Sequence, residues 1–171
     1  MVLNKGLPEL IRTAKENGVA VLAINNSHHM AAMWPETETV AEAGLVAFAC
    51  TSYKPAVAPA GAIKPLFGTN PISFAWPRPG KTPVVFDMAT ASMAMGEVQV
   101  AKREGHKVPL GTGLTKDGKE TTDPGEIAKM NSPPLGGPPS LLSLAAVSKL
   151  KLSPTNAPAN NSTIIAIPDP L

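Results

Sequence analysis

Val-Ala-Val-Leu-Ala-Ile at positions 19–24 is a continuous apolar segment of strand length, and a second apolar segment, Leu45–Thr51, follows it along the chain. An apolar run without polar alternation is typical of a strand covered on both faces, so we predict that Val19–Ile24 is a central strand. A polar turn, Asn25-Asn26-Ser27, and a helical pattern that continues to Ala43 with a break near Pro35 lie between the two segments. A strand, a helix and a strand in this order predict a crossover unit and an α/β fold.

The remaining elements follow from apolar spacing and turn residues. Leu7, Leu10 and Ala14 recur at helical spacing. Pro8 suits the first turn of this helix, and Gly18 can end it. Further along, the sequence predicts a surface loop over Tyr53–Gly68, a hairpin of Pro71–Trp76 and Pro83–Met88, a helix within Ser92–Glu104, and a polar loop over Lys107–Gly125 with a turn at Lys116–Lys119.

The composition changes after Met130. The last 41 residues hold eight prolines and only three charged side chains, and no helical or strand period persists in them. Leu141–Leu152 is long enough for a brief helix, but prolines flank it. We therefore predict a folded portion at residues 1–130 and, at residues 131–171, a proline-rich tail outside the core that is disordered or read in a shifted frame.

The overall composition disfavours several classes of protein. Of the 171 residues, 43% are hydrophobic and 16% are charged, which favours a globular chain over a disordered one. The formal net charge of +2 gives no broad field that would attract nucleic acid or anionic lipid, so neither is an expected partner. No apolar run reaches the roughly 20 residues that cross a bilayer. The single cysteine, Cys50, suits a reducing compartment, and the expected location is the cytoplasm.

The first candidate site is Asn26-Ser27-His28-His29, because it follows an apolar strand and precedes a helix. Ser27 is the predicted N-cap. Free N–H groups at such a helix start favour anions, and a histidine there can donate or relay a proton. A polar surface cap explains the same residues. Adjacent histidines are a poor pair of metal ligands, and there is no cysteine–histidine cluster, so we expect no metal.

Two further candidates lie later in the chain. In Gly68-Thr69-Asn70-Pro71 the glycine allows close backbone approach, and Thr69 and Asn70 offer hydrogen-bonding groups. An ordinary turn also explains this segment. Asp87 ends an apolar strand, where a helix cap and a catalytic carboxylate are equally good interpretations.

Other residues that can carry chemistry have simpler explanations. Cys50 is expected to pack in the core, because no adjacent basic group would lower its pKa. The methionines between Met88 and Met95 are predicted to fill gaps in the core. His106 lies in a polar turn beside Lys107, and we expect it to face solvent.

In their order along the chain, these motifs resemble the malate/L-lactate dehydrogenase type of NAD(P)H-dependent oxidoreductase, a family distinct from the Rossmann-fold dehydrogenases. The matching pieces are Ser27-His28-His29, Ala43-Gly44-Leu45-Val46, Pro59 with Gly61, Gly68-Thr69-Asn70-Pro71, Phe86-Asp87-Met88-Ala89-Thr90 and Thr121-Thr122-Asp123-Pro124. Within the family, Ser27–Glu36 and Lys64–Gly68 are most similar to the delta-1-piperideine-2-carboxylate/delta-1-pyrroline-2-carboxylate reductases. The resemblance covers residues 7–130. It implies an incomplete, non-Rossmann α/β fold with a mixed sheet and flanking helices.

The resemblance also implies a site. The cofactor, NADPH or alternatively NADH, would be bound by His29, Met30, Ala31, Ala32, Met33, Ser52, Tyr53, Asp87, Met88 and Ala89. Asp87 would be catalytic, as part of a proton relay, and Thr69 would face the substrate. Hydride delivery to an imine carbon needs a cofactor held at fixed geometry, and the imine nitrogen needs a proton donor oriented by a carboxylate. Full-length members of the family are expected to form homodimers.

The chain departs from the family pattern at both ends. Family members begin with a helical region that carries a serine–histidine catalytic pair and a substrate-binding arginine, and they continue after the Thr-Asp-Pro segment to a Gly-Lys-Gly cofactor contact. We therefore expect a truncated or frameshifted reading frame. Loss of the principal proton donor costs about 10²-fold or more, so low or no activity is expected of this chain alone. Within the match, Ser52 stands where asparagine is usual, and Ala60 where glycine or a polar residue is usual.

The expected function is the NADPH-dependent reduction of cyclic imino acids. The reactions would convert delta-1-piperideine-2-carboxylate to pipecolate and delta-1-pyrroline-2-carboxylate to proline. Two alternatives stay open: a malate/L-lactate-type dehydrogenase that acts on 2-hydroxy acids, and an inactive remnant that only binds the cofactor.

Overall fold

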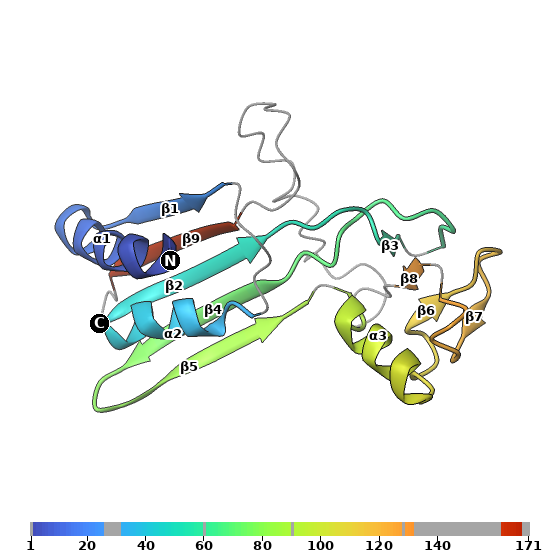
Figure 1. Cartoon of the computed structure of the whole chain (residues 1–171). Coiled ribbons are helices and arrows are strands. Elements are labelled where there is room, and N and C mark those ends of the chain that lie inside the picture. Colours follow the sequence, from blue (N-terminus) through green and yellow to red (C-terminus); the bar gives the residue numbers. More distant parts are fainter. Residues whose placement is uncertain are drawn as a thin grey trace. The chain divides into compact units, whose positions relative to one another are not determined.

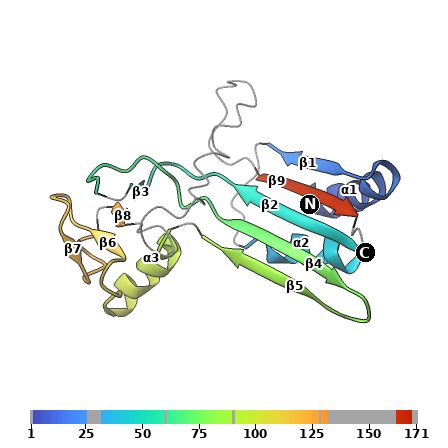
Figure 2. The same cartoon turned by 180° about the vertical axis from the view of Figure 1, so that it is seen from behind.

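The computed structural model describes residues 2–25, 32–59, 61–89, 91–127, 129–131 and 162–168, drawn from two sides in Figures 1 and 2. The chain forms two compact units. The first consists of Met1–Thr51, Pro71–Met88 and Ala157–Leu171, and the second of Ser52–Asn70 and Ala89–Asn156. Both units draw on residues from either side of Met130, so the predicted division at that residue does not separate them.

The first unit contains α1 (Val2–Asn17), β1 (Ala20–Ile24), α2 (Trp34–Glu42), β2 (Leu45–Thr51), β4 (Ile72–Arg78), β5 (Lys81–Met88) and β9 (Ser162–Pro168). The second contains β3 (Val57–Ala58), α3 (Met95–Glu104), β6 (Gly113–Leu114), β7 (Glu120–Thr121) and β8 (Lys129–Asn131). The predicted combination of helices and strands in an α/β fold is confirmed.

A five-stranded sheet in the order β1-β9-β2-β4-β5 is the centre of the first unit. All its neighbouring strands are antiparallel. Both α1 and α2 pack on one face of this sheet. Figure 2 shows the sheet from its other face, with the two helices behind it. On this face lies the core cluster of buried residues: Leu10, Ala14, Ala20, Met33, Val40, Ala41, Leu45, Ala47, Ala49, Ala75, Ile164 and Ala166.

The prediction that the last 41 residues lie outside the core is wrong for Ser162–Pro168. This strand pairs with β1 on one side and with β2 on the other, and Ile164 and Ala166 are fully buried. Its apolar side chains alternate on the two faces of the sheet, which overrides the proline-rich composition around it. Because β1 and β2 are both antiparallel to β9, they are parallel to each other, as the predicted crossover requires.

The prediction that Val19–Ile24 is a central strand is also wrong. In the described structure β1 is an edge strand, and Val21 is 60% exposed. Its alternate residues Ala20 and Ile24 are buried on the side of α1. An apolar run shows that a strand can be covered on both faces but does not show that it is.

The N-terminal helix is longer than predicted. It begins at Val2, so Pro8 lies inside it instead of in its first turn. Pro8 is exposed, and the carbonyl group that its missing N–H leaves unpaired can be hydrated there. Gly18 ends the helix as predicted, with φ +80° and its N–H donated to the Ala14 carbonyl at 2.9 Å.

The predicted hairpin is confirmed as β4 and β5. Arg78 and Lys81 are the last paired residues, so the turn is Pro79-Gly80, shorter than the predicted one. Gly80 has φ +68°, which suits a tight turn. On β5, Val85 packs against the core, while Val84 and Phe86 are 51% and 47% exposed. Asp87 therefore shares the helix-covered side of the strand with Val85.

The second unit is built around a four-stranded sheet in the order β3-β8-β6-β7, together with α3. The helix predicted within Ser92–Glu104 is confirmed, and so is the turn at Lys116–Lys119, where the Gly118 N–H donates to the Thr115 carbonyl at 3.1 Å. Met93 and Met95 pack against the buried cluster of this unit, as predicted.

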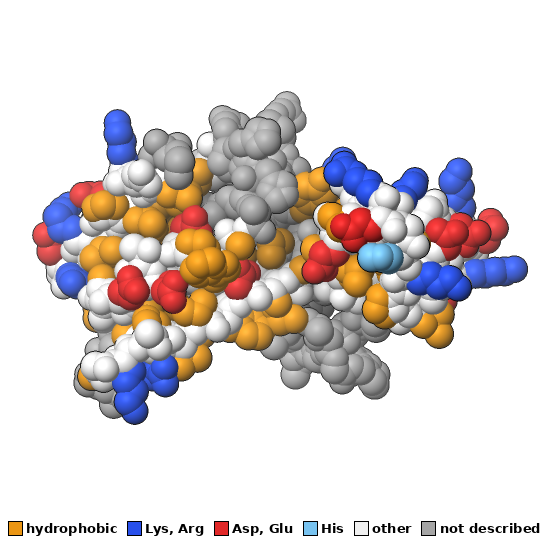
Figure 3. All heavy atoms as spheres, turned by 60° about the horizontal axis from the view of Figure 1, so that its bottom comes forward, with side chains coloured by type: hydrophobic (Ala, Val, Ile, Leu, Met, Phe, Trp, Pro, Cys, Tyr) orange, Lys and Arg blue, Asp and Glu red, His pale blue; other side chains and the backbone are white. Residues whose placement is uncertain are grey.

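The surface carries charges of both signs. Figure 3 shows Lys and Arg side chains interspersed with Asp and Glu, and hydrophobic side chains reach the surface between them. The prediction that His106 faces solvent is confirmed by a side chain that is 71% exposed. Among the helices in the described residues, none is both long enough and apolar enough to cross a membrane.

Candidate active site

Asp87 is the centre of the candidate site in the first unit. Its Oδ2 accepts hydrogen bonds from the backbone N–H groups of Met33 and Trp34, each at 2.8 Å. These residues are the N-cap and the first residue of α2, where N–H groups have no partner within the helix. A carboxylate at this position satisfies both donors and interacts favourably with the helix dipole.

The N-cap of α2 is Met33, with Pro35 in the first turn and no side-chain cap from the adjacent chain. The predicted N-cap Ser27 lies outside the described residues. Asp87 supplies the cap from 54 positions away in the sequence. The N–H groups of Met33 and Trp34 are therefore taken by a protein carboxylate. The Asn26–His29 segment itself, with Met30 and Ala31, lies outside the described residues.

A buried pair of hydroxyl groups joins α2 to the sheet beside Asp87. Thr37 and Ser73 are both fully buried, and their oxygens lie 2.7 Å apart. Thr37 Oγ1 also lies 3.3 Å from the Met33 carbonyl and 3.2 Å from that of Trp34. Both hydrogens find acceptors if Ser73 donates to Thr37 and Thr37 donates to the helix carbonyls. Ser73 is the direct cross-strand partner of Asp87, so neighbouring positions of β4 and β5 hold the same helical turn.

Glu36 places a second carboxyl group in this turn. Burial raises the pKa of Glu36, the nearby charge of Asp87 raises it further, and a hydrogen bond with its own backbone opposes the shift. Its Oε2 is buried and has no hydrogen-bond partner among the described residues. Sequence reasoning missed this residue, although an acidic side chain in the first turn of a helix that packs on a sheet was a signal.

The segments Ser52–Tyr53 and Gly68–Asn70 meet within the second unit. The Tyr53 N–H donates to Asn70 Oδ1 at 3.0 Å. A Cβ atom built on Gly68 would lie only 2.7 Å from the carbonyl carbon of Tyr53, so this approach requires glycine. The predicted substrate residue Thr69 therefore lies between two residues that contact Tyr53. The close backbone approach predicted for Gly68 is confirmed.

The described residues of the predicted cofactor site differ in accessibility. Ala32 and Tyr53 are exposed, while Met33 is 1% exposed and belongs to the core. The Met33 side chain is therefore not accessible to a ligand, and its N–H is already bonded to Asp87. Ser52 and Met88 are half-buried.

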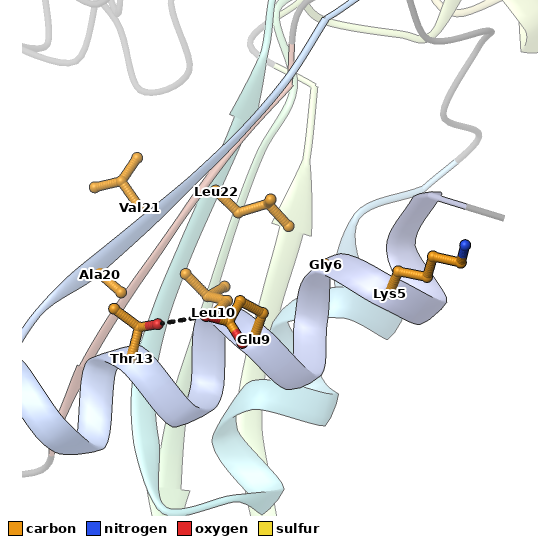
Figure 4. A pocket seen from close by; sticks show the side chains of 8 residues that line it. All are labelled: Lys5, Gly6, Glu9, Leu10, Thr13, Ala20, Val21 and Leu22. Atoms are coloured by element: carbon orange, nitrogen blue, oxygen red, sulfur yellow. Dashed lines mark hydrogen bonds between the residues drawn. The ribbon is translucent and has the colours of Figure 1, made fainter.

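A groove lies at the other edge of the first sheet, away from Asp87. It has a volume of about 490 Å³ and is lined by Lys5, Gly6, Glu9, Leu10, Thr13, Ala20, Val21 and Leu22. Figure 4 shows that it lies between α1 and β1, with Leu22 of the strand facing the helix. Since β1 and β5 are opposite edges of the sheet, this groove is separate from Asp87.

Among the described residues, the other reactive side chains form no further site. Burial raises the pKa of the half-buried Cys50 thiol, which disfavours the reactive thiolate. Within the ranges that the structure describes, no three His, Cys, Asp or Glu side chains are grouped so that they could hold a metal ion.

Comparison with known proteins gives a consistent family match. The family model of malate/L-lactate dehydrogenase matches residues 1–146. A Delta(1)-pyrroline-2-carboxylate/Delta(1)-piperideine-2-carboxylate reductase from Pseudomonas putida is 54% identical over 118 residues, which cover 69% of this chain and 35% of that protein. The corresponding Pseudomonas aeruginosa reductase is 51% identical over the same length. The chain thus spans about a third of the length of these curated relatives.

Solved structures share the fold. The crystal structure of delta1-piperideine-2-carboxylate reductase from Pseudomonas syringae pv. tomato superposes with a TM-score of 0.79 at 38% identity, covering 96% of this chain and 55% of that one. The family match extends past Met130 to residue 146, and the superposition covers nearly the whole chain.

Proposed function

The chain belongs to the malate/L-lactate dehydrogenase family, and on this basis we propose that its protein reduces cyclic imino acids with NADPH. Delta-1-piperideine-2-carboxylate would give pipecolate, and delta-1-pyrroline-2-carboxylate would give proline. The names of the Pseudomonas relatives support this substrate class over 2-hydroxy acids.

The observation that carries the proposal is the position of Asp87. Its Oδ2 accepts both N–H groups of α2, so the helix cap does not engage Oδ1. A carboxylate held in this way can orient a proton donor with its second oxygen, because rotation about its side-chain bonds would break both bonds to α2.

The accessible residues fit a nicotinamide cofactor in part. Ala32 offers a small exposed side chain at the start of α2, and Tyr53 offers an exposed ring. We propose that the cofactor is held by residues 29–33, by Ser52 and Tyr53, and by Asp87–Ala89, with Met33 contributing through its hydrogen bond to Asp87. When bound, NADPH supplies the hydride for the imine carbon.

The chain's own residues would orient the substrate and the proton. The imine carbon gains a hydride, the ring nitrogen gains a proton, and the products are the cyclic amino acid and NADP⁺. Asp87 would orient the donor of that proton, and Thr69 would hold the substrate. Position matters more than acidity here, because a proton moves efficiently only to an atom within hydrogen-bond reach.

We also propose a cytoplasmic homodimer, in line with the family resemblance and with the single cysteine. Size-exclusion chromatography with light scattering tests the dimer, and a monomer at micromolar concentration would contradict it.

The function is tested by NADPH oxidation in the presence of delta-1-piperideine-2-carboxylate. Oxidation of malate and L-lactate by NAD⁺ is assayed in parallel, and NADPH fluorescence reports binding. We expect low imino-acid turnover from this chain alone, which Asp87→Asn lowers further by about 10²-fold. Turnover of the 2-hydroxy acids alone would support the alternative dehydrogenase, and NADPH binding without any turnover would support a cofactor-binding remnant.

A further inference from the structure

Asn70 has an unusual backbone conformation. Among the described residues it is the non-glycine residue with a positive φ, at +33°. Side chains with a Cβ rarely adopt this region, and asparagine is one of the few that tolerate it. Asn70 directly follows Thr69, so this conformation determines the direction in which the chain leaves the proposed substrate residue.

The side chain of Asn70 binds a segment 17 positions earlier. Its amide faces the backbone N–H of Tyr53 at 3.0 Å. Because a backbone N–H can only donate, the atom that faces it is the oxygen Oδ1. Asn70 therefore combines an uncommon backbone angle with a bond that spans two loop segments.

Neighbouring contacts fix the same two segments. The Val57 N–H donates to the Phe67 carbonyl at 2.8 Å, and the Phe67 N–H donates to the Val57 carbonyl at 3.1 Å. Gly68 brings its backbone against that of Tyr53, where any side chain would collide. The hydrogen bond from the Tyr53 N–H to Asn70 Oδ1 joins the same two segments at the end where Thr69 lies.

We propose that Asn70 is a positioning residue of the reductase, which holds Thr69 beside the Ser52–Tyr53 segment. The inference rests on the proposed function, in which Thr69 faces the substrate and Tyr53 borders the cofactor. The left-handed backbone of Asn70 sets the direction of Thr69, and its side-chain oxygen sets the separation of the two segments. Asn70 acts through these neighbours and does not itself contact the reacting atoms.

Three substitutions separate the two contributions. Asn70→Gly permits the positive φ but removes the oxygen that accepts from Tyr53. Asn70→Asp keeps an acceptor oxygen and still tolerates the backbone angle. Asn70→Ala removes both contributions. Asn17→Ala is a matched control, since Asn17 is exposed in α1 and its side-chain amide donates to the Thr13 carbonyl one turn earlier.

The measurements are KM for delta-1-piperideine-2-carboxylate, kcat, the NADPH dissociation constant from fluorescence, and the urea midpoint. For Asn70→Gly we expect KM and the NADPH dissociation constant to rise about fivefold, the equivalent of one lost hydrogen bond. Asn70→Asp should restore NADPH affinity to within about twofold of wild type, and Asn70→Ala should be the most impaired. Asn17→Ala should change none of the binding constants.

The proposal is overturned if Asn70→Gly retains the wild-type KM and NADPH affinity, because the side chain would then position nothing. It is also overturned if Asn70→Gly lowers only the urea midpoint, since the bond would then have a structural role alone. Should the wild-type protein bind NADPH without reducing imino acids, the proposed function fails, and the NADPH affinities of the variants still decide the role of Asn70. A wild-type protein that neither binds NADPH nor reduces imino acids refutes both proposals.

Discussion

Substitution of Asp87 by alanine should destabilise the first unit by removing the cap of α2. The change deletes the acceptor of two N–H groups that donate to one carboxylate oxygen, each at 2.8 Å. Met33 is 1% exposed, so water cannot readily replace the lost partner of its N–H, whereas Trp34 is 49% exposed and its N–H can be rehydrated.

The expected magnitude follows from this asymmetry. A buried donor left without a partner costs about 1–3 kcal/mol, and the loss of a helix cap typically costs about 1 kcal/mol. We therefore expect Asp87→Ala to lower the free energy of unfolding by about 2–3 kcal/mol. Asp87→Asn keeps an acceptor oxygen and loses only the interaction of the charge with the helix dipole, so its cost should be about 1 kcal/mol.

Urea unfolding followed by circular dichroism measures these differences. The control is Asp123→Ala, which removes a carboxylate bound to the backbone N–H of Gly125 at 2.7 Å in an exposed turn without a helix. We expect the control to stay within about 0.5 kcal/mol of wild type. The reasoning is refuted if Asp87→Ala is no more destabilising than Asp87→Asn, or if both match the control.

Three further changes test neighbouring features. Thr37→Val leaves the buried hydroxyl of Ser73 without its partner and should cost about 1–3 kcal/mol in urea unfolding, while the double variant with Ser73→Ala should recover part of this loss. The pKa of Glu36 is raised in the folded state. The folded state is therefore not penalised at pH values below the usual glutamate pKa, where Glu36 is protonated, and it loses stability as the pH rises through the raised pKa. Glu36→Gln should therefore increase stability near neutral pH and lose this advantage below about pH 4, and equal effects at both pH values in urea unfolding would contradict this reasoning. Gly68→Ala should separate the backbones at Tyr53 and speed hydrogen exchange of the Tyr53 amide, which unchanged protection would disprove.

Local patterns in the sequence predicted local elements well. The helical spacing before Gly18 and the turn residues between β4 and β5 each act over a few positions, and both elements are confirmed. The location of β9 could not be predicted in this way. Ile164-Ile165-Ala166-Ile167 is an apolar run of strand length, but its place between β1 and β2 depends on contacts with residues more than a hundred positions away. Among the described strands, β1 pairs with β9 alone and is therefore at the edge of the sheet.

The candidate site shows the same division between local and long-range information. Asp87 and Thr69 were identifiable, because a carboxylate at a strand end and a Gly-Thr-Asn turn are local signals. Thr37 and Ser73 are ordinary residues in the sequence, and their contact depends on the packing of α2 against β4. The sequence identifies Asn70 only as a hydrogen-bonding group, since its bond to Tyr53 requires two loop segments to pair.

The two sequence interpretations of Asp87, helix cap and catalytic carboxylate, turn out to be compatible. The structure confirms the cap, in which both N–H groups of α2 donate to the same carboxylate oxygen, Oδ2. Capping fixes the orientation of the carboxylate and ties it to the segment that begins α2. A carboxylate that orients a proton donor needs such fixation, because a misplacement of about 1 Å can cost 10²-fold in rate. The helix cap is therefore the structural reason why Asp87 suits the relay proposed for it.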